Sequence, residues 1–579
     1  MPDRSSLASS PTPEPGTASP VSAAGPAPWR LFVPKLVTAL RQGYGLPDLR
    51  ADLIAGLTVA IVALPLAMAL AIASGTTPDK GLVTAIVAGF LISALGGSRY
   101  QIGGPTGAFV VVVFNVIAQH GYDGLVLATL MAGVMLLALG YGRVGTYIKY
   151  VPYPVVTGFT AGIAVIIFTS QIKDLLGLTM VVTPAEFAAK LAAYADALPT
   201  IHWPTVAVAF GSLAMILAIR RWKPQLPVFL IAVVAGSLAV MALGLPVDTI
   251  GSRFGGIPTE LPTPVFPEIT WKRLVELSPS AFTIAFLAGI ESLLSAVVAD
   301  GMTGRKHRSN CELVAQGAAN IASALFGGLP ATGAIARTAT NVRSGARTPV
   351  AGMAHAVFLL LFMLALAPLA VFVPLASLAA VLVIVAWNMA EVDHFRHLMK
   401  APVGDRVVLI LTFSLTVLVD LTVAIQVGVV LAAFLFMHRM ANAVEVETHT
   451  RVIDDDEDDF AKAPTPDYPP LPEGVEVYRI SGPFFFGAAA KLGEVLDRIR
   501  KPPRVFILRM RLVPLIDATG GHALEEFLRR CEAHGTQVIL SGVQDQPRRL
   551  MGELGLAGRV RFAPDTPTAI AEAERLLRG

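Results

Sequence analysis

Long apolar runs, separated by short polar breaks, occupy the chain from about residue 53 to residue 440. An apolar run of about 20 residues crosses a bilayer as a helix, and a soluble domain cannot bury a long series of such runs. Only 15% of the 579 residues are charged, against about 25% in soluble domains. The sequence therefore predicts an α-helical polytopic membrane protein rather than an ordinary cytosolic enzyme, a nucleic-acid scaffold or a disordered chain. About fourteen spans are predicted, at 53–74, 81–97, 106–119, 123–140, 154–172, 204–219, 227–244, 279–299, 311–327, 334–346, 350–373, 375–390, 405–420 and 421–440.

Positive charge between the runs indicates their orientation. With the N-terminus inside, fifteen Lys and Arg residues fall in cytoplasmic loops and six in external loops. This bias is expected for an even number of spans with both termini in the cytoplasm. The six external residues are Lys80, Lys173, Lys190, Arg253, Lys272 and Arg273.

Four parts of the chain differ in composition. Residues 1–45 begin with a Ser-, Pro-, Ala- and Gly-rich stretch and are predicted to be a disordered tail, and residues 46–440 form the transmembrane domain. Residues 441–470 hold an acidic, Pro-rich stretch that predicts a linker. Residues 471–579 alternate strand-like and helical patterns, which predicts a small cytoplasmic α/β domain. Its expected strands are 475–480, 505–510, 536–542 and 559–562, with helices at 488–500, 519–533 and 548–554 and a last one ending at 577.

Motifs for energy-driven or metal chemistry are missing from the sequence. No phosphate-binding GxxxxGK loop, no metal-ligand spacing and no Ser-His-Asp set is found, and the two cysteines, Cys311 and Cys531, lie far apart. The net charge of +3 argues against a large basic surface for nucleic acid. We expect no enzyme activity, cofactor or metal, and movement of a solute down a gradient or coupled to one.

A repeated phrase gives the strongest internal signal. GGPTGAFV at 103–110 opens the third span and GGLPATGAIARTATN at 327–341 opens the tenth. Paired short apolar segments broken by Gly and Pro indicate the substrate site of an inverted-repeat transporter. Helices that begin at the bilayer midplane direct unpaired N–H groups and partial positive charge toward each other, which favours an anion. The alternative is that Gly and Pro only kink packed helices.

Two ionisable residues lie within predicted spans. Arg337 follows the second phrase, and a buried Arg in a membrane needs a partner or a substrate. Glu291 lies in an apolar run, where desolvation favours the protonated acid, so we expect it to exchange a proton. A structural Glu291–Arg337 ion pair is the alternative.

In the first span, Pro65 breaks the helix where protein or a cavity must satisfy the freed backbone groups. Small neighbours such as Ala67 would allow a substrate to approach closely. The predicted substrate-binding residues are Pro65, Ala67, Gly104, Thr106, Gly107, Ala108, Ala334, Ala336, Arg337 and Thr338.

Four segments carry a resemblance to the SulP family of anion transporters with a C-terminal STAS domain: DLIAGLTVAIVALPLAMALA (52–71), GGPTGAF (103–109), the segment 289–349 and PLIDATG (514–520). The resemblance implies two inverted repeats of seven spans, core and gate domains, elevator-like movement, a homodimer and a bacterial inner membrane. It implies a substrate site between spans one, three, eight and ten, with Glu291 as the acidic residue and Arg337 as the basic residue. A chain with both residues looks unlike the sodium-coupled bicarbonate members of the family. The segments PLAMALAIASG and AIARTATN look most similar to its bacterial four-carbon dicarboxylate transporter.

We therefore expect a proton-coupled transporter of small dianions, either a four-carbon dicarboxylate or sulfate. Rival hypotheses are an uncoupled exchanger or channel, a bicarbonate transporter, a nucleobase–cation symporter and a membrane signalling scaffold built on the STAS domain. The STAS resemblance places a regulatory loop at Asp517 and Thr519, but Ala518 stands where a phosphorylatable Ser is usual. Docking of a cytosolic partner is therefore the expected role of this domain.

Overall fold

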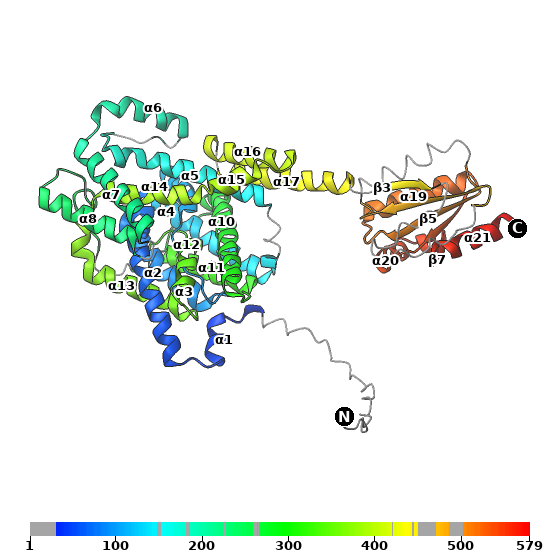
Figure 1. The fold of residues 1–579 in the computed structure, drawn as a ribbon, viewed down its shortest axis with the longest axis horizontal. Coiled ribbons are helices and arrows are strands. Elements are labelled where there is room, and N and C mark those ends of the chain that lie inside the picture. The colour runs from blue at the N-terminus through cyan, green and yellow to red at the C-terminus, as the bar shows by residue number, and fades with distance from the viewer. Residues whose placement is uncertain are drawn as a thin grey trace, which may run out of the picture. The chain divides into compact units, whose positions relative to one another are not determined.

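The chain divides into a helical unit, Met1–Gly428, and a second unit, Val429–Gly579 (Figure 1). The two units are seen in a computed structural model. The residues that it describes are 31–146, 152–180, 184, 186–223, 226–258, 263–264, 266–419, 421–442, 445–449, 471–485 and 502–578.

The first seven predicted spans correspond to helices of the first half. These are α2 (Leu46–Ala73), α3 (Pro78–Leu95), α4 (Gly107–Tyr141), α5 (Tyr153–Leu176), α7 (Trp203–Trp222) and α8 (Val228–Leu243). Two predicted spans lie on α4, which breaks at Gly121, where φ is 70° and ψ is 178°. Two short helices, α6 (Phe187–Ala197) and α9 (Ile250–Phe254), lie outside the spans.

The second half repeats this order. Its helices are α10 (Trp271–Thr303), α11 (Ser309–Leu325), α12 (Ile335–Arg343), α13 (Val350–Ala370), α14 (Leu375–Met389), α15 (Val392–Leu398), α16 (Val403–Leu418) and α17 (Leu421–Asn442). Nine helical segments of the described chain are long and apolar enough to cross a membrane, and α8 is a shorter apolar helix. The polytopic helical fold is therefore confirmed.

The helices pack as two bundles. One, which we call the core bundle, contains α2, α3, α4, α10, α11, α12 and α13. The other, the gate bundle, contains α5, α7, α8, α14 and α16. Contacts of α2 with α8 and α14, and of α4 with α5, join the two bundles. This division matches the core and gate domains that the resemblance implied.

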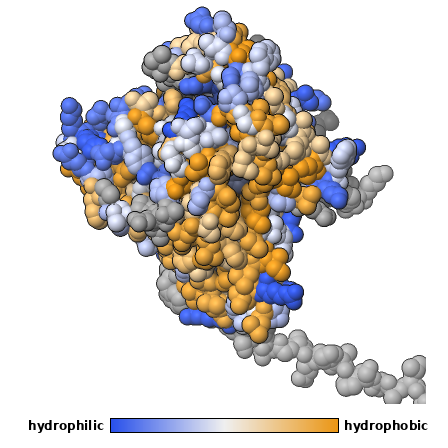
Figure 2. Space-filling model, turned by 90° about the vertical axis from the view of Figure 1, so that its left-hand side faces the viewer, coloured by the Kyte–Doolittle hydropathy of each residue, from blue (hydrophilic) through white to orange (hydrophobic). Residues whose placement is uncertain are grey.

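The outer surface of the helical unit is apolar. Figure 2 shows a broad hydrophobic face on the side where α8 and α13 lie in Figure 1. Exposed side chains there include Leu238, Met241, Leu243, Leu361, Leu364 and Leu369. A soluble protein does not expose so large an apolar area, so lipid is its natural partner.

Part of the predicted disordered tail is folded, which corrects that prediction for residues 31–45. These residues contain α1 (Lys35–Arg41), and the backbone N–H of Lys35 donates to the carbonyl of Gly96 at 2.9 Å. Arg308 donates to the carbonyl of Val33 at 2.6 Å. The helix is too short to give a strong sequence signal, and tertiary contacts hold it. Residues 1–30 lie outside the described residues.

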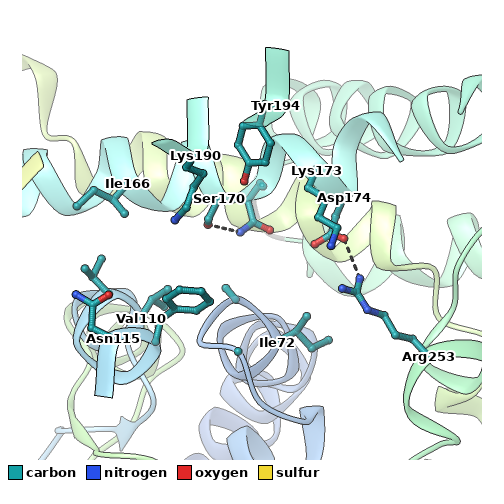
Figure 3. Close-up of a pocket in the computed structure, with 15 residues that line it drawn as sticks. Ile72, Val110, Asn115, Ile166, Ser170, Lys173, Asp174, Lys190, Tyr194 and Arg253 are labelled. Atoms are coloured by element: carbon teal, nitrogen blue, oxygen red, sulfur yellow. Dashed lines mark hydrogen bonds and ion pairs between the residues drawn. The ribbon is translucent and has the colours of Figure 1, made fainter. Parts of the chain in front are cut away.

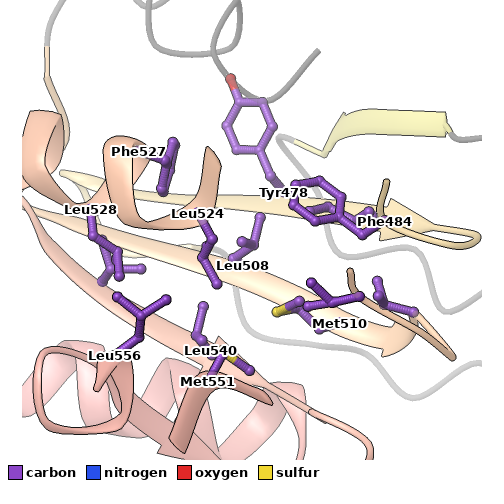
Figure 4. Close-up of a cluster of buried hydrophobic side chains, with 14 of the residues drawn as sticks. Tyr478, Phe484, Leu508, Met510, Leu524, Phe527, Leu528, Leu540, Met551 and Leu556 are labelled. Atoms are coloured by element: carbon purple, nitrogen blue, oxygen red, sulfur yellow. The ribbon is translucent and has the colours of Figure 1, made fainter. Parts of the chain in front are cut away.

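The second unit is an α/β domain, as predicted. Strands β4 (Val475–Ser481), β5 (Val505–Leu512), β6 (Gln537–Ser541) and β7 (Arg561–Ala563) pair in parallel in that order. Helices α19 (Ala518–Ala533) and α20 (Asp545–Glu553) supply the core shown in Figure 4, while α21 (Thr566–Arg578) packs with a second apolar cluster of the sheet. The predicted helix 488–500 and the acidic run lie outside the described residues.

One strand of this sheet was not expected. β3 (Glu445–His449) lies within the stretch predicted to be a linker, and it pairs antiparallel with β4. Its sequence, EVETH, alternates charged and less polar residues, which suits an edge strand. The run is only five residues long and stands beside an acidic stretch, so its pattern is weak without its partner strand.

Candidate functional site

Two very short strands meet inside the core bundle. β1 (Gly103–Gly104) pairs antiparallel with β2 (Thr332–Gly333), and Gly103 lies opposite Gly333. Each strand leads directly into a helix, α4 at Gly107 and α12 at Ile335. The chain is extended at both N-caps, Thr106 and Ala334, so these are true helix starts. The alternative of kinks in continuous helices is therefore wrong.

The paired strands bring two helix N-termini to the same place. The first N–H groups of a helix have no partner within it, and the helix dipole places about half a positive charge there. At α12, Ile335 is 41% exposed and Ala336 is also exposed, so the first turn of this helix is open on one side. At α4, Gly107 and Ala108 are buried. The junction can therefore attract an anion mainly from the side of α12.

Arg337 belongs to α12 and contacts the chain just before α4, so it connects the two helix starts. Its side chain is 3% exposed, and its Nη2 donates to the carbonyl of Pro105 at the entry to α4. Within the described chain its Nε and Nη1 atoms have no hydrogen-bond partner. A Cβ built at Gly104 would lie 2.5 Å from Nη1, so the guanidinium lies directly against β1. A buried cation with unpaired donors is unstable unless an anion completes it.

Glu291 lies on α10, and its side chain is beside the start of α4. Its Oε2 accepts a hydrogen bond from Thr106 Oγ1 at 2.9 Å, and both side chains are half-buried. The ion pairs of the described residues do not include one between Glu291 and Arg337. Within the described chain the acid and the base thus bind separate parts of the α4 entry, with no ion pair between them shorter than 4 Å.

The other predicted site residues also lie in the core bundle. Thr338 is fully buried, and its Oγ1 accepts from the backbone N–H of Ile102 and from Ser295 Oγ, both at 3.1 Å. It therefore stabilises the junction. Pro65 and Ala67 are buried on α2, which packs against α12.

Sequence reasoning missed a buried polar network behind the junction. Glu312 is fully buried, and its carboxylate accepts from the backbone N–H groups of Gly97 and Ser98 and from two side-chain amides, those of Gln101 and Gln316, at 2.9 to 3.1 Å. Gln101 also donates to the carbonyl of Ser292 at 3.0 Å.

The hydroxyl of Ser292 continues this network to β2. It lies 2.7 Å from Thr332 Oγ1 and accepts from the backbone N–H of Gly333 at 3.0 Å. A signal was present in the sequence, because polar residues recur at helical spacing along the predicted span 311–327. They are Glu312, Gln316, Asn320 and Ser323, and all are buried.

In the second unit, the predicted regulatory loop begins α19. The carboxylate of Asp517 caps this helix by accepting from the backbone N–H of Gly520 at 2.7 Å. Thr519 is exposed on the first turn. The geometry gives Asp517 a structural role, while a regulatory role for this loop stays a prediction. The described part of the chain holds no cluster of His, Cys, Asp and Glu that could bind a metal.

Comparisons with known proteins agree with this architecture. Residues 49–412 match the family model described as sulfate permease family, and residues 470–569 match the STAS domain. A putative sulfate transporter of Bacillus subtilis, YvdB, is 43% identical over 90% of this chain and 96% of its own. The bicarbonate transporter BicA of Picosynechococcus is 32% identical over 89% and 92%.

Solved structures share the fold. Murine Slc26a9, described as an anion transporter in the inward-facing state, superposes with a TM-score of 0.83 at 18% identity and 96% coverage of both chains. The transmembrane domain of a cyanobacterial BicA superposes with a TM-score of 0.59 at 29% identity, covering 67% of this chain and 98% of that one. The chain belongs to the sulfate permease (SulP/SLC26) family of anion transporters, and it carries the STAS domain at its C-terminal end.

Proposed function

We propose that this chain is a proton-coupled secondary transporter of small dianions, sulfate or a four-carbon dicarboxylate. The observation that supports this most is the buried Arg337 at the junction of two helix N-termini, where two of its nitrogen atoms have no hydrogen-bond partner among the described residues. Two helix dipoles contribute about half a charge each and Arg337 contributes one, so the junction carries roughly two positive charges. A dianion neutralises that charge, whereas a monoanion leaves about half of it.

Glu291 supplies the coupling to protons in this proposal. When its carboxylate is ionised, it places a negative charge beside Thr106 and opposes an incoming anion. When it is protonated, the full positive charge of the junction is available to the substrate. The proton and the dianion therefore favour each other's binding, which is the requirement for symport.

The location of the site in one bundle supports an elevator movement. The strands β1 and β2 and the helices α2, α4, α10 and α12 all belong to the core bundle. The core bundle can therefore carry the bound anion past the gate bundle as one body. Transport then needs no rearrangement of the site itself.

Bicarbonate is the second candidate substrate. The relative BicA is a bicarbonate transporter, and it matches most of this chain. With Glu291 ionised, the net positive charge of the junction falls to about one, which suits a monoanion. In that case transport is not proton-coupled, and an uncoupled exchanger or channel becomes the simpler mechanism.

Uptake by the purified full-length protein in proteoliposomes tests the proposal. Labelled sulfate, succinate, fumarate and bicarbonate are supplied with and without an inward proton gradient at constant membrane potential. We expect sulfate or a dicarboxylate to accumulate faster when the gradient is present. Bicarbonate uptake that ignores the gradient would select the second candidate, and a conductance without proton movement would select a channel.

The assembly is also part of the proposal. We expect a homodimer with both termini in the cytoplasm, and a cytosolic partner that binds the STAS domain. Cross-linking in intact membranes and labelling of cysteines introduced near each terminus test these two points. If residues 471–579 alone replaced the whole protein in cells, the signalling scaffold would be favoured over transport.

A further inference from the structure

A cavity of about 160 Å³ lies between the core and gate bundles, near the C-terminal ends of α2 and α5 (Figure 3). Its walls come from α2 and α4 on one side and from α5, α6 and α9 on the other. Because a water molecule occupies about 30 Å³, the cavity has room for a small anion with a few waters. It is distinct from the junction of β1 and β2, none of whose residues line it.

The lining of this cavity is positively charged. Three of the six cations that the sequence places on the external side line it: Lys173, Lys190 and Arg253. One acid, Asp174, also lines it and pairs with Arg253 at 3.0 Å. About two positive charges are therefore left without a counter-charge in the lining.

Two buried polar groups line the cavity, Lys190 and Tyr194, and buried polar groups normally need partners. Lys190 is 5% exposed, and its Nζ lies 5.3 Å from the centre of the Phe114 ring. Burial lowers the pKa of Lys190, because the ammonium is poorly compensated there. Tyr194 is 4% exposed, and its hydroxyl has no hydrogen-bond partner within the described chain. Burial raises the pKa of Tyr194 to about 12, so the phenol keeps its proton and can donate it.

We propose that this cavity is a second anion-binding site, which takes a small oxyanion of the size of sulfate or bicarbonate. Lys190 and Tyr194 are its direct ligands, and Figure 3 shows both side chains extending from α6 toward α5. Lys173 and Arg253 attract the anion to the same cavity. Because the walls belong to both bundles, a bound anion joins them in the present arrangement. This site does not depend on the substrate or the coupling proposed for the central junction.

Protection from thiol labelling tests the site in the full-length protein in right-side-out membrane vesicles. Ser170→Cys places a thiol on the α5 wall, and a membrane-impermeant maleimide added outside measures its accessibility. The naturally present Cys311 and Cys531 are buried, which keeps the background low. Sulfate and bicarbonate are added at constant ionic strength, with gluconate as a bulky control anion. Asn115→Cys on the opposite wall gives the same measurement if Ser170→Cys does not assemble.

We expect sulfate or bicarbonate to slow labelling and gluconate to leave it unchanged. Lys190→Gln in this background should raise the half-protecting concentration by more than about tenfold, because it removes a buried charge partner. Lys190→Arg should restore protection, and Lys272→Gln, which removes an exposed lysine outside the cavity, should have no effect.

Arg337→Ala distinguishes the two sites, since it disables only the central one. Protection that persists in Arg337→Ala supports a separate site, even if that variant shows that the central proposal is wrong. Protection that disappears in Arg337→Ala, or no protection by any anion in the parent cysteine variants, would overturn the second site.

Discussion

The two helix starts at the junction have similar backbones but different side chains. The first, at α4, has the hydroxyl of Thr106 at its N-cap and Glu291 as a neighbour, and its first turn is buried. The second, at α12, has Ala334 at its N-cap, and the first two residues of the helix, Ile335 and Ala336, are exposed. Arg337 belongs to the second helix but donates to the carbonyl of Pro105 beside the first.

This difference allows anion binding and proton binding to occur at different helix starts, whereas a symmetric site would combine both at each start. The repeated backbone supplies positive potential from both sides. The side chains then place the acid beside the start of α4 and leave the first residues of α12 exposed. We infer that α12 provides the anion-binding side and α4 the proton-responsive side. The following changes test this division of roles.

Gly104→Val should have the largest effect. Gly104 has a φ of 150°, and an added Cβ would lie 2.5 Å from Arg337 Nη1 and 3.4 Å from Ala85 Cα. Backbone strain alone costs about 1–3 kcal/mol, and displacement of the guanidinium should abolish uptake. Thermal unfolding in detergent and uptake in proteoliposomes measure the two effects. Gly121→Val is the control, because Gly121 has a φ of 70° but nothing within 4 Å of its Cβ position. Normal uptake by Gly104→Val would show that the position of Arg337 is unimportant.

Arg337→Ala should weaken binding of a dianion by well over tenfold, about 1.4 kcal/mol or more. The loss arises because the substrate then meets only the two helix dipoles. The concentration dependence of labelled sulfate uptake measures it. Arg343→Ala, on the last turn of the same helix and exposed, should leave the apparent KM unchanged. Equal effects of both variants would argue that Arg337 acts only through general charge.

Glu291→Gln should make uptake independent of pH while the protein stays folded. The amide oxygen can still accept the hydrogen bond from Thr106, but the side chain no longer binds or releases a proton. Uptake rates over a range of external pH, at saturating and at low substrate, provide the measurement. Glu276→Gln on the same helix, where Glu276 lies 3.6 Å from His120, is the matched control. An unchanged pH profile in Glu291→Gln would remove the coupling role from this residue.

Thr106→Val should shift the pH profile by a smaller amount. It removes one hydrogen bond to Glu291, worth about 0.5–1.5 kcal/mol, or up to roughly tenfold in the proton affinity of that carboxyl. The pH at half-maximal uptake should move, and the affinity for the dianion at low pH should stay. Thr106→Ser keeps the hydroxyl and should behave as the parent protein. A large loss of dianion affinity in Thr106→Val would place substrate binding at α4 rather than α12.

Asp517→Ala gives a reference for an ordinary helix cap in water. It removes the hydrogen bond to the backbone N–H of Gly520 and should cost the second unit about 1 kcal/mol. Hydrogen exchange of β5 and β6 in the full-length protein measures this loss. Uptake should keep its KM, because the cap lies outside the transmembrane unit. A changed KM would instead indicate that the STAS domain regulates transport.

Most of the fold could be predicted from the sequence because its signals are local. Apolar runs located the helices, and the Gly/Pro phrases located the starts of α4 and α12. The residues at which the two helices start relative to the repeated phrases could not be predicted in this way. The phrases equate Thr106 with Thr332, whereas the N-caps are Thr106 and Ala334. β1 pairs with β2 between these two phrases, and strand pairing between distant segments leaves no periodic signal.

The partners at the site were less predictable than its residues. Arg337 and Glu291 stand out because charge is rare in a membrane span. Their partners, the Pro105 carbonyl and the Thr106 hydroxyl, are 232 and 185 residues away along the chain. Glu312 gives a weak signal in the sequence, because it follows a polar stretch and resembles a residue at the end of a span. Only the packing of α3 against α11 shows that it is buried.

The pairing of β1 with β2 also constrains how the protein is made. Gly103 leaves the ribosome 230 residues before its partner Gly333. At about 5–20 residues per second, the first segment waits roughly 10–50 seconds for the second. During that time its extended backbone lacks the hydrogen bonds that lipid cannot supply, and each missing bond costs several kcal/mol. The nascent first half must therefore stay beside water or the insertion machinery until the second half arrives.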